Sequence, residues 1–127
     1  MKNKSYAESF RHAFDGIKLI IKEERNMKIH IIMTILVILC AVIFNLTASE
    51  KAIVISLCFI TMAFELLNTA IENAVDMYSP VFNMFAKRAK DLSAGAVLLV
   101  SIGSAIAGLI IFVPYGINLL EKIIERI

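Results

Sequence analysis

Three long apolar segments dominate the chain, and each is long enough to cross a membrane. They extend over residues 29–46, 52–78 and 92–113. A helix needs about 20 apolar residues to cross the hydrocarbon core of a bilayer, which is roughly 30 Å thick. With 59% hydrophobic residues in 127, the chain fits neither a disordered protein nor an ordinary soluble domain. We therefore predict one domain, residues 1–127, that is all-α and crosses the membrane with three helices.

Residues 5–24 predict a further, amphipathic helix. Ser5 and Glu8 match the S-x-x-E capping box that often begins a helix. Apolar side chains then recur three or four positions apart, at Tyr6, Phe10, Phe14, Ile17 and Ile21. This pattern is typical of a helix lying in the membrane interface, and packing against a partner protein is the alternative.

The second apolar segment ends in a stripe of acidic and amide side chains. Glu65, Asn68, Glu72 and Asp76 follow one another at intervals of three, four and four residues. Such intervals place all four on one face of a helix. A carboxylate within a membrane costs at least about 2.5 kcal/mol and is a functional-site candidate by default. The stripe predicts a site that holds cations. Because three helices of one protomer are too few to enclose it, we expect neighbouring protomers to help shield it.

Other charged residues stand beside the ends of the apolar segments. Lys90 and Asp91 precede the third segment, where Lys90 could contact a phosphate and Asp91 could N-cap the helix. Glu23 and Glu24 precede the first segment. Since Mg²⁺ is usually held by one or two carboxylates together with phosphate oxygens, one of these two and Glu72 could supply such a site. The alternative for these charges is an ordinary solvated, basic membrane boundary.

The distribution of Lys and Arg predicts the orientation. Ten of the 13 precede the first segment or lie between the second and third, namely Lys2, Lys4, Arg11, Lys18, Lys22, Arg25, Lys28, Lys87, Arg88 and Lys90. The other three, Lys51, Lys122 and Arg126, lie on the opposite side. We expect a multi-pass protein of the cell membrane whose N-terminus and acidic stripe face the cytoplasm and whose C-terminus lies outside.

Taken together, these residues resemble the prokaryotic diacylglycerol kinases, a family of small membrane lipid kinases. The resemblance rests on the pattern E-x-x-N-T-A-I-E-x-x-x-D over residues 65–76, on Ala89-Lys90-Asp91 and on a third segment rich in small residues. It implies a homotrimer of protomers with one surface helix and three transmembrane helices. It also implies that MgATP phosphorylates a lipid alcohol at the cytoplasmic interface, with no nucleic acid involved.

The resemblance implies a role for each site residue. Glu65 matches the general base that takes the proton of the lipid hydroxyl. Glu24 and Glu72 match the ligands of Mg²⁺ and nucleotide. Asn68, Asp76, Lys90 and Asp91 match the residues that surround and contact the nucleotide.

Two stretches indicate a branch of the family and so a substrate. Residues 9–16 and 23–30 resemble the Gram-positive branch, of which many members prefer undecaprenol. We therefore expect an undecaprenol kinase, with diacylglycerol as the alternative substrate. A small proton- or cation-coupled transporter is the alternative of another class, because acidic stripes also form ion relays.

Overall fold

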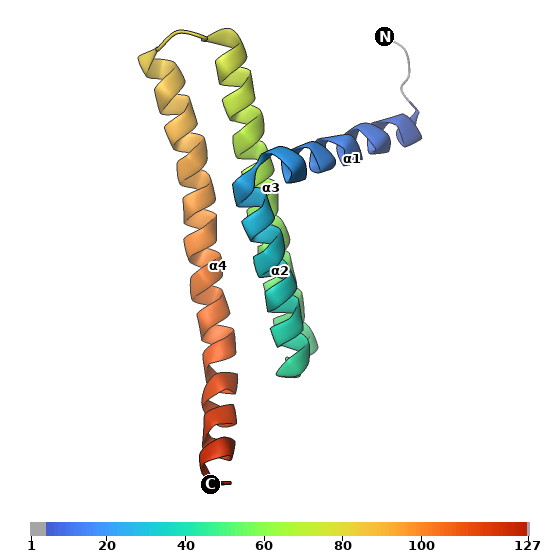
Figure 1. The fold of residues 1–127 in the computed structure, drawn as a ribbon, viewed down its shortest axis with the longest axis vertical. Helices are drawn as coiled ribbons and strands as arrows, with labels where there is room; N and C mark the ends of the chain where they lie inside the picture. The colour runs from blue at the N-terminus through green and yellow to red at the C-terminus, as the bar shows by residue number, and fades with distance from the viewer. Residues whose placement is uncertain (1–4, 127) are drawn as a thin grey trace.

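The computed structural model describes residues 5–126. Over this range four helices follow one another: α1 (Tyr6–Glu23), α2 (Arg25–Ile43), α3 (Ala48–Tyr78) and α4 (Met84–Ile124) (Figure 1). The last three are long and apolar enough to cross a membrane. The predicted all-helical architecture, with three helices of sufficient length and apolar character to span a membrane, is therefore confirmed. Lys2 and Lys4, which enter the charge count, lie outside the described residues.

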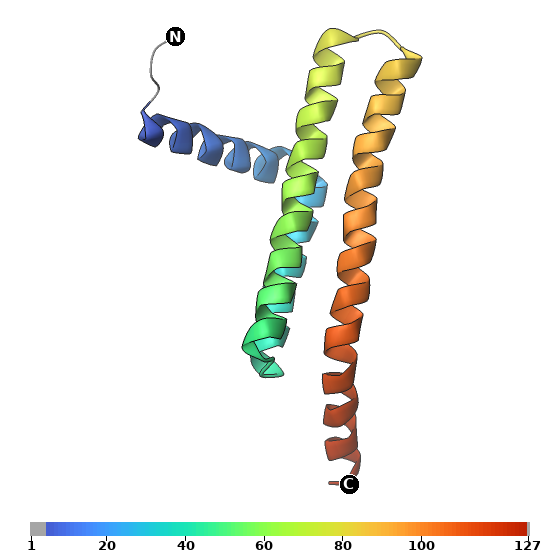
Figure 2. The ribbon, with the colours of Figure 1, turned by 180° about the vertical axis from the view of Figure 1, so that it is seen from behind.

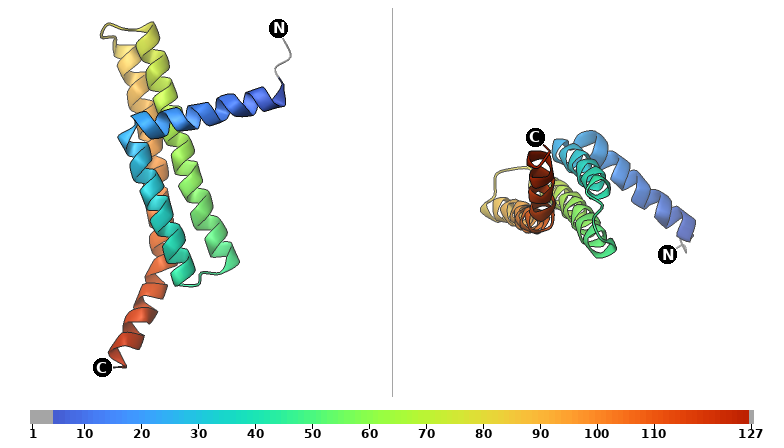
Figure 3. Two further views of the ribbon diagram at one scale, coloured as in Figure 1. Left: turned by 45° about the vertical axis from the view of Figure 1, so that its right-hand side comes forward. Right: turned by 90° about the horizontal axis from the view of Figure 1, so that it is seen from below.

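The three long helices lie side by side, with α3 in contact with both others (Figure 2). Neighbouring helices run in opposite directions, so the α2–α3 turn and the α3–α4 loop lie at opposite ends of the bundle. Helix α1 leaves the bundle at a steep angle to α2 and extends away from it (Figure 3). The α3–α4 loop projects beyond the level at which α1 leaves. With 31 residues, α3 is about 46 Å long, more than a bilayer core requires.

Helix α1 begins and ends differently from the prediction. The side chain of Ser5 makes no capping hydrogen bond, so the predicted capping box with Glu8 is wrong. The carbonyl of Ser5 instead accepts hydrogen bonds from the backbone N–H groups of Glu8 and Ser9, at 2.9 and 3.1 Å. At the other end, Glu24 alone separates α1 from α2. Its extended backbone, with φ −95° and ψ 122°, turns the chain sharply.

A capping box does exist, at the start of α3. The side chain of Thr47 accepts a hydrogen bond from the N–H of Glu50 at 3.3 Å, and Glu50 accepts one from the N–H of Thr47 at 2.8 Å. Beside it, Asn45 takes the left-handed conformation, with φ +52°, which Asn tolerates better than most residues. The turn is therefore closed by local hydrogen bonds.

A small apolar core holds the same end of the bundle together. It consists of Ala41, Leu46 and Val54, each 2–3% exposed. Partly buried aromatic side chains of α4, Phe112 and Tyr115, pack against it. Apolar side chains nearer the start of α4 face outward, such as Leu99, which is 74% exposed. Such a surface is expected of a protein whose spanning helices face lipid or other protomers.

Helix α4 begins earlier than predicted. Asn83 is its N-cap, and the side-chain oxygen accepts hydrogen bonds from the N–H groups of Phe85 and Ala86. Asp91 lies within the helix and pairs with Lys87 at 2.6 Å, so the predicted N-cap at Asp91 is wrong. The apolar pattern marks only the part within the membrane, whereas the helix continues through the charged turns before it.

Helix α4 also ends later than predicted. The third predicted segment ends at residue 113, just before Pro114, but the helix continues to Ile124. Proline lacks an N–H group and crowds the preceding turn, so it bends a helix that neighbouring contacts hold in place. Figure 3 shows the bend near the C-terminal end of α4.

Candidate active site

The four stripe residues lie on one unbroken helix, α3, so their predicted common face is preserved. Their exposure increases toward the α3–α4 loop. Glu65 is buried, at 3% exposure. Asn68 and Glu72 are half-buried, and Asp76 is exposed. The stripe therefore extends over about 17 Å from a buried carboxylate to a solvated one.

The deepest carboxylate of the stripe is buried within a single chain, since Glu65 is 3% exposed. The expectation that neighbouring protomers help to shield the rest of the stripe stays a prediction. Glu72 and Asp76, in contrast, remain accessible. A single protomer thus shields the inner end of the stripe and leaves the outer end open to a water-soluble ligand.

Asn68 connects the stripe to α4. Its side-chain N–H donates to Oε1 of Glu72 at 3.2 Å, and its Oδ1 accepts a hydrogen bond from the hydroxyl of Ser93 at 2.7 Å. The hydroxyl of Ser93 also lies 2.9 Å from the carbonyl oxygen of Lys90. Ser93, 8% exposed, was missed by the sequence analysis. Its position three residues after Lys90, on the same face of a helix, was the available signal.

Lys90 reaches the outer end of the stripe. Its Nζ lies 2.6 Å from Oδ1 of Asp76, with the two side chains 35% and 64% exposed. Asp91 faces elsewhere and pairs with Lys87 at the surface. The fold therefore joins Asn68, Glu72, Asp76 and Lys90 with Ser93, whereas Asp91 stands at the edge of this group.

An open hollow of about 400 Å³ lies beside the pair of Lys90 and Asp76, where α3 turns into α4. Both residues line it, together with Lys87 and residues of the loop. Two lysines and one carboxylate give its polar wall a positive balance. The hollow can accept an anionic group without burying any of these charges.

Glu24 lies at the break between α1 and α2 and is half-buried. Helix α1 contacts both α2 and α3, so the break lies against the helix that carries the stripe. Among residues 5–126, no three or more His, Cys, Asp and Glu side chains are grouped so that they could hold a metal ion. The predicted magnesium site requires only two carboxylates, Glu24 and Glu72, with phosphate oxygens as further ligands. Hard oxygen donors suit Mg²⁺, and Glu72 keeps its Oε2 available while Oε1 accepts from Asn68.

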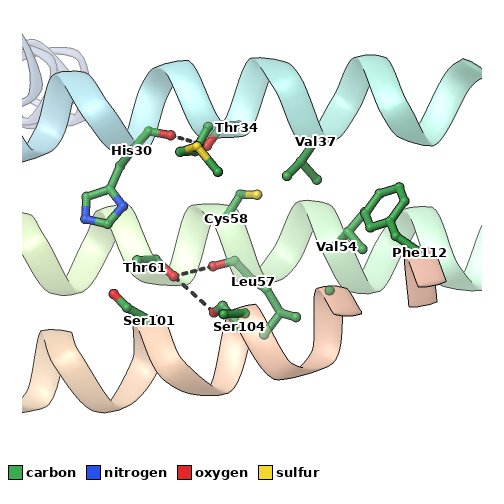
Figure 4. Close-up of a pocket in the computed structure, with 13 residues that line it drawn as sticks. His30, Thr34, Val37, Val54, Leu57, Cys58, Thr61, Ser101, Ser104 and Phe112 are labelled. Carbon is green, nitrogen blue, oxygen red and sulfur yellow. Dashed lines mark hydrogen bonds between the residues drawn. The ribbon is translucent and has the colours of Figure 1, made fainter. Parts of the chain in front are cut away.

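A second cavity lies deeper, in a groove between α2, α3 and α4. It has a volume of about 260 Å³ (Figure 4). Two of its hydroxyl groups bond to the backbone of their own helix: Thr34 donates to the carbonyl of His30, and Thr61 to that of Leu57. Thr61 also lies 3.2 Å from the hydroxyl of Ser104, one of the small residues expected to allow close packing. The groove therefore provides apolar packing rather than groups for catalysis.

Comparisons with known proteins identify the family to which the sequence is similar. The sequence profile of the family described as prokaryotic diacylglycerol kinase matches residues 11–112. Undecaprenol kinase of Bacillus subtilis (strain 168) is 38% identical over 109 residues, 86% of this chain and 89% of that protein.

Two diacylglycerol kinases are also similar. That of Synechocystis sp. is 36% identical over 113 residues, 88% of this chain and 65% of that protein. That of Helicobacter pylori (strain J99) is 32% identical over 101 residues, 77% of this chain and 79% of that protein. The family profile covers α2 and α3 entirely, α1 from residue 11 and α4 as far as residue 112.

Proposed function

The chain belongs to the prokaryotic diacylglycerol kinase family of membrane lipid kinases, and we propose that it transfers the γ-phosphate of ATP to the hydroxyl of undecaprenol. The observation that carries the proposal is the gradient along α3, from buried Glu65 to exposed Asp76 paired with Lys90. A lipid hydroxyl arrives from the membrane and a polyphosphate from water. The gradient offers each of them a suitable environment on one helix face.

The outer end of the stripe would bind the nucleotide. Lys90 and Asp91 would contact its phosphates and sugar, and Asn68 and Asp76 would complete the surroundings. Glu24 and Glu72 would hold Mg²⁺, which would neutralise charge on the phosphates. Positioning and charge neutralisation are the main sources of catalysis in phosphoryl transfer. Lys90 can serve this role because it is half-buried and its present partner, Asp76, is solvated.

Glu65 would act as the general base. A base for the lipid hydroxyl must lie where the lipid headgroup can reach, below the level of the triphosphate. Glu65 lies about 10 Å along α3 from Glu72, on the membrane side. Asn68, between them, is fixed by Ser93 and Glu72. It would keep the metal-binding and proton-accepting carboxylates apart.

The assembly and orientation are further parts of the proposal. The exposed apolar faces of α2 and α4 would pack in a homotrimer and against lipid. Helix α1 would lie in the cytoplasmic interface, with Phe10 and Phe14, 68% and 59% exposed, directed into lipid. The ten-to-three distribution of Lys and Arg supports a cytoplasmic N-terminus and active site and an external C-terminus. Labelling of single cysteines at positions 2 and 126 from each side of intact cells tests this orientation.

We favour undecaprenol over diacylglycerol as the substrate because of the similarity to the undecaprenol kinase of Bacillus subtilis. It aligns at higher identity than the diacylglycerol kinases and over a larger share of its own length. The resemblance of residues 9–16 and 23–30 to the Gram-positive branch points the same way. Diacylglycerol remains the alternative substrate.

The test uses purified protein in proteoliposomes with radiolabelled ATP and either undecaprenol or diacylglycerol. We expect label mainly in undecaprenyl phosphate. Label mainly in phosphatidic acid would favour the alternative substrate. If neither lipid is labelled while the liposomes move protons or cations, the transporter hypothesis replaces the kinase. When Glu→Gln variants of the site are measured in the same assay, Glu121→Gln is their control, because it removes a carboxylate from the exposed end of α4.

A further inference from the structure

The end of α4 lies outside the family profile and outside the candidate active site. The family profile ends at residue 112, whereas the helix continues to Ile124. Pro114 lies two residues past this boundary, and Figure 3 shows α4 bent near its C-terminal end. Residues 115–126 therefore follow both the last position of the family profile and the proline.

The contacts of Tyr115 mark where the bundle ends. Its hydroxyl donates to Oε2 of Glu50 at 2.7 Å, and its ring lies 6.2 Å from that of Phe44 in the α2–α3 turn. From Met84 to Tyr115, α4 already extends about 48 Å, more than a bilayer core requires. Every residue from 117 to 126 is exposed, and Figure 1 shows this end of α4 projecting past the α2–α3 turn.

The projecting segment separates apolar from polar side chains completely. At 100° per residue, its apolar side chains occupy one arc of about 160° and its polar side chains the opposite arc of about 140°. The apolar residues are Ile117, Leu119, Leu120, Ile123 and Ile124, between 47% and 71% exposed. The polar residues are Asn118, Glu121, Lys122, Glu125 and Arg126.

We propose that residues 115–126 form a surface helix that lies on the membrane at the end of the bundle remote from the active site, with its apolar face in lipid. A bilayer that surrounds the apolar part of α4 would end near this level, so the lipid surface would continue the environment of the spanning part. A broad apolar arc suits a helix that lies in the membrane–water interface, whereas a helix of a coiled coil needs only a narrow apolar seam. A segment of about three turns is also short for a coiled coil.

The absence of tryptophan from the chain makes a direct test possible. Leu120→Trp places a reporter on the apolar face. Asn118→Trp places one two residues away on the opposite face and is the matched control. Each full-length variant is reconstituted in vesicles whose lipids carry bromine atoms on the acyl chains, and iodide is used as the aqueous quencher. Circular dichroism of both variants checks that the helices are intact.

We expect bromine to quench Leu120→Trp several-fold more strongly than Asn118→Trp, and iodide to show the reverse order. Equal quenching of both variants by iodide would place the segment in water and overturn the proposal. Protection of Leu120→Trp from both quenchers would indicate that a second copy covers the apolar face, which would also overturn it. The readout does not use phosphoryl transfer, so it is independent of the kinase assignment.

A second variant tests the bend. Pro114→Ala restores the missing N–H group and favours a straight helix that would project into water. In the Leu120→Trp background it should reduce quenching by bromine and increase quenching by iodide. Unchanged quenching would show that Pro114 does not direct the segment onto the membrane and would remove that part of the proposal.

Discussion

The hydroxyl of Ser93 donates a 2.7 Å hydrogen bond to Oδ1 of Asn68 and so joins α4 to the polar stripe of α3. The bond determines which end of the Asn68 amide faces Glu72, because an oxygen that accepts from Ser93 leaves the N–H group to donate to the carboxylate. The orientation of the predicted metal ligand thus depends on a serine of another helix.

Replacing Ser93 by Ala should therefore impair catalysis without changing any charged group. A buried acceptor left without its donor costs about 1–3 kcal/mol, and 1.4 kcal/mol corresponds to about tenfold in rate. We expect kcat/KM for MgATP to fall about tenfold. Ser101→Ala, a change of a half-buried serine in the apolar groove, is the control. Equal effects of the two changes would contradict the role given to Ser93.

Glu65→Gln should lower kcat by roughly 10²-fold or more, the usual scale for loss of a general base. The affinity for MgATP should change little, because the group acts in the transition state rather than on bound nucleotide. If Glu65 is only structural, the variant should instead lose stability and assembly while the intact fraction turns over normally. Measurements of kcat, ATP affinity and oligomeric state on one preparation separate these outcomes.

Glu24→Gln and Glu72→Gln should each weaken binding of MgATP and raise the magnesium concentration needed for half-maximal activity. The change keeps the shape of the side chain and removes its charge, so the phosphates lose a metal bridge. Titration of activity with Mg²⁺ at fixed ATP measures this requirement. An unchanged requirement in both variants would exclude the proposed metal site.

The pair of Lys90 and Asp76 predicts opposite effects for its two members. Lys90→Met should raise KM for ATP about tenfold, since a phosphate contact to a cation contributes on the order of 1.5–3 kcal/mol. Asp76→Asn should leave KM unchanged or lower it, because Lys90 is released from its partner. Neither change should alter stability much, since an exposed ion pair contributes about 1 kcal/mol at most. Similar increases in KM for both variants would instead indicate that the pair acts as a structural unit.

Much of the architecture and site could be predicted from periodicity alone. Intervals of three and four residues place Glu65, Asn68, Glu72 and Asp76 on one face of any helix, whatever surrounds it. Apolar segments of about 20 residues imply spanning helices. The T-x-x-E pattern at Thr47 and Glu50 carried a capping signal as clear as that at Ser5 and was overlooked.

Only the tertiary structure decided which residues meet across helices. The bond of Ser93 to Asn68 and the pairing of Lys90 with Asp76 rather than Asp91 depend on the rotation and axial position of α4 against α3. Those are set by packing of side chains distant in sequence, and local periodicity contains no information on them. For the same reason Glu65 is buried within one chain. The sequence by itself determined the face on which each group lies, and packing between helices determined its partner.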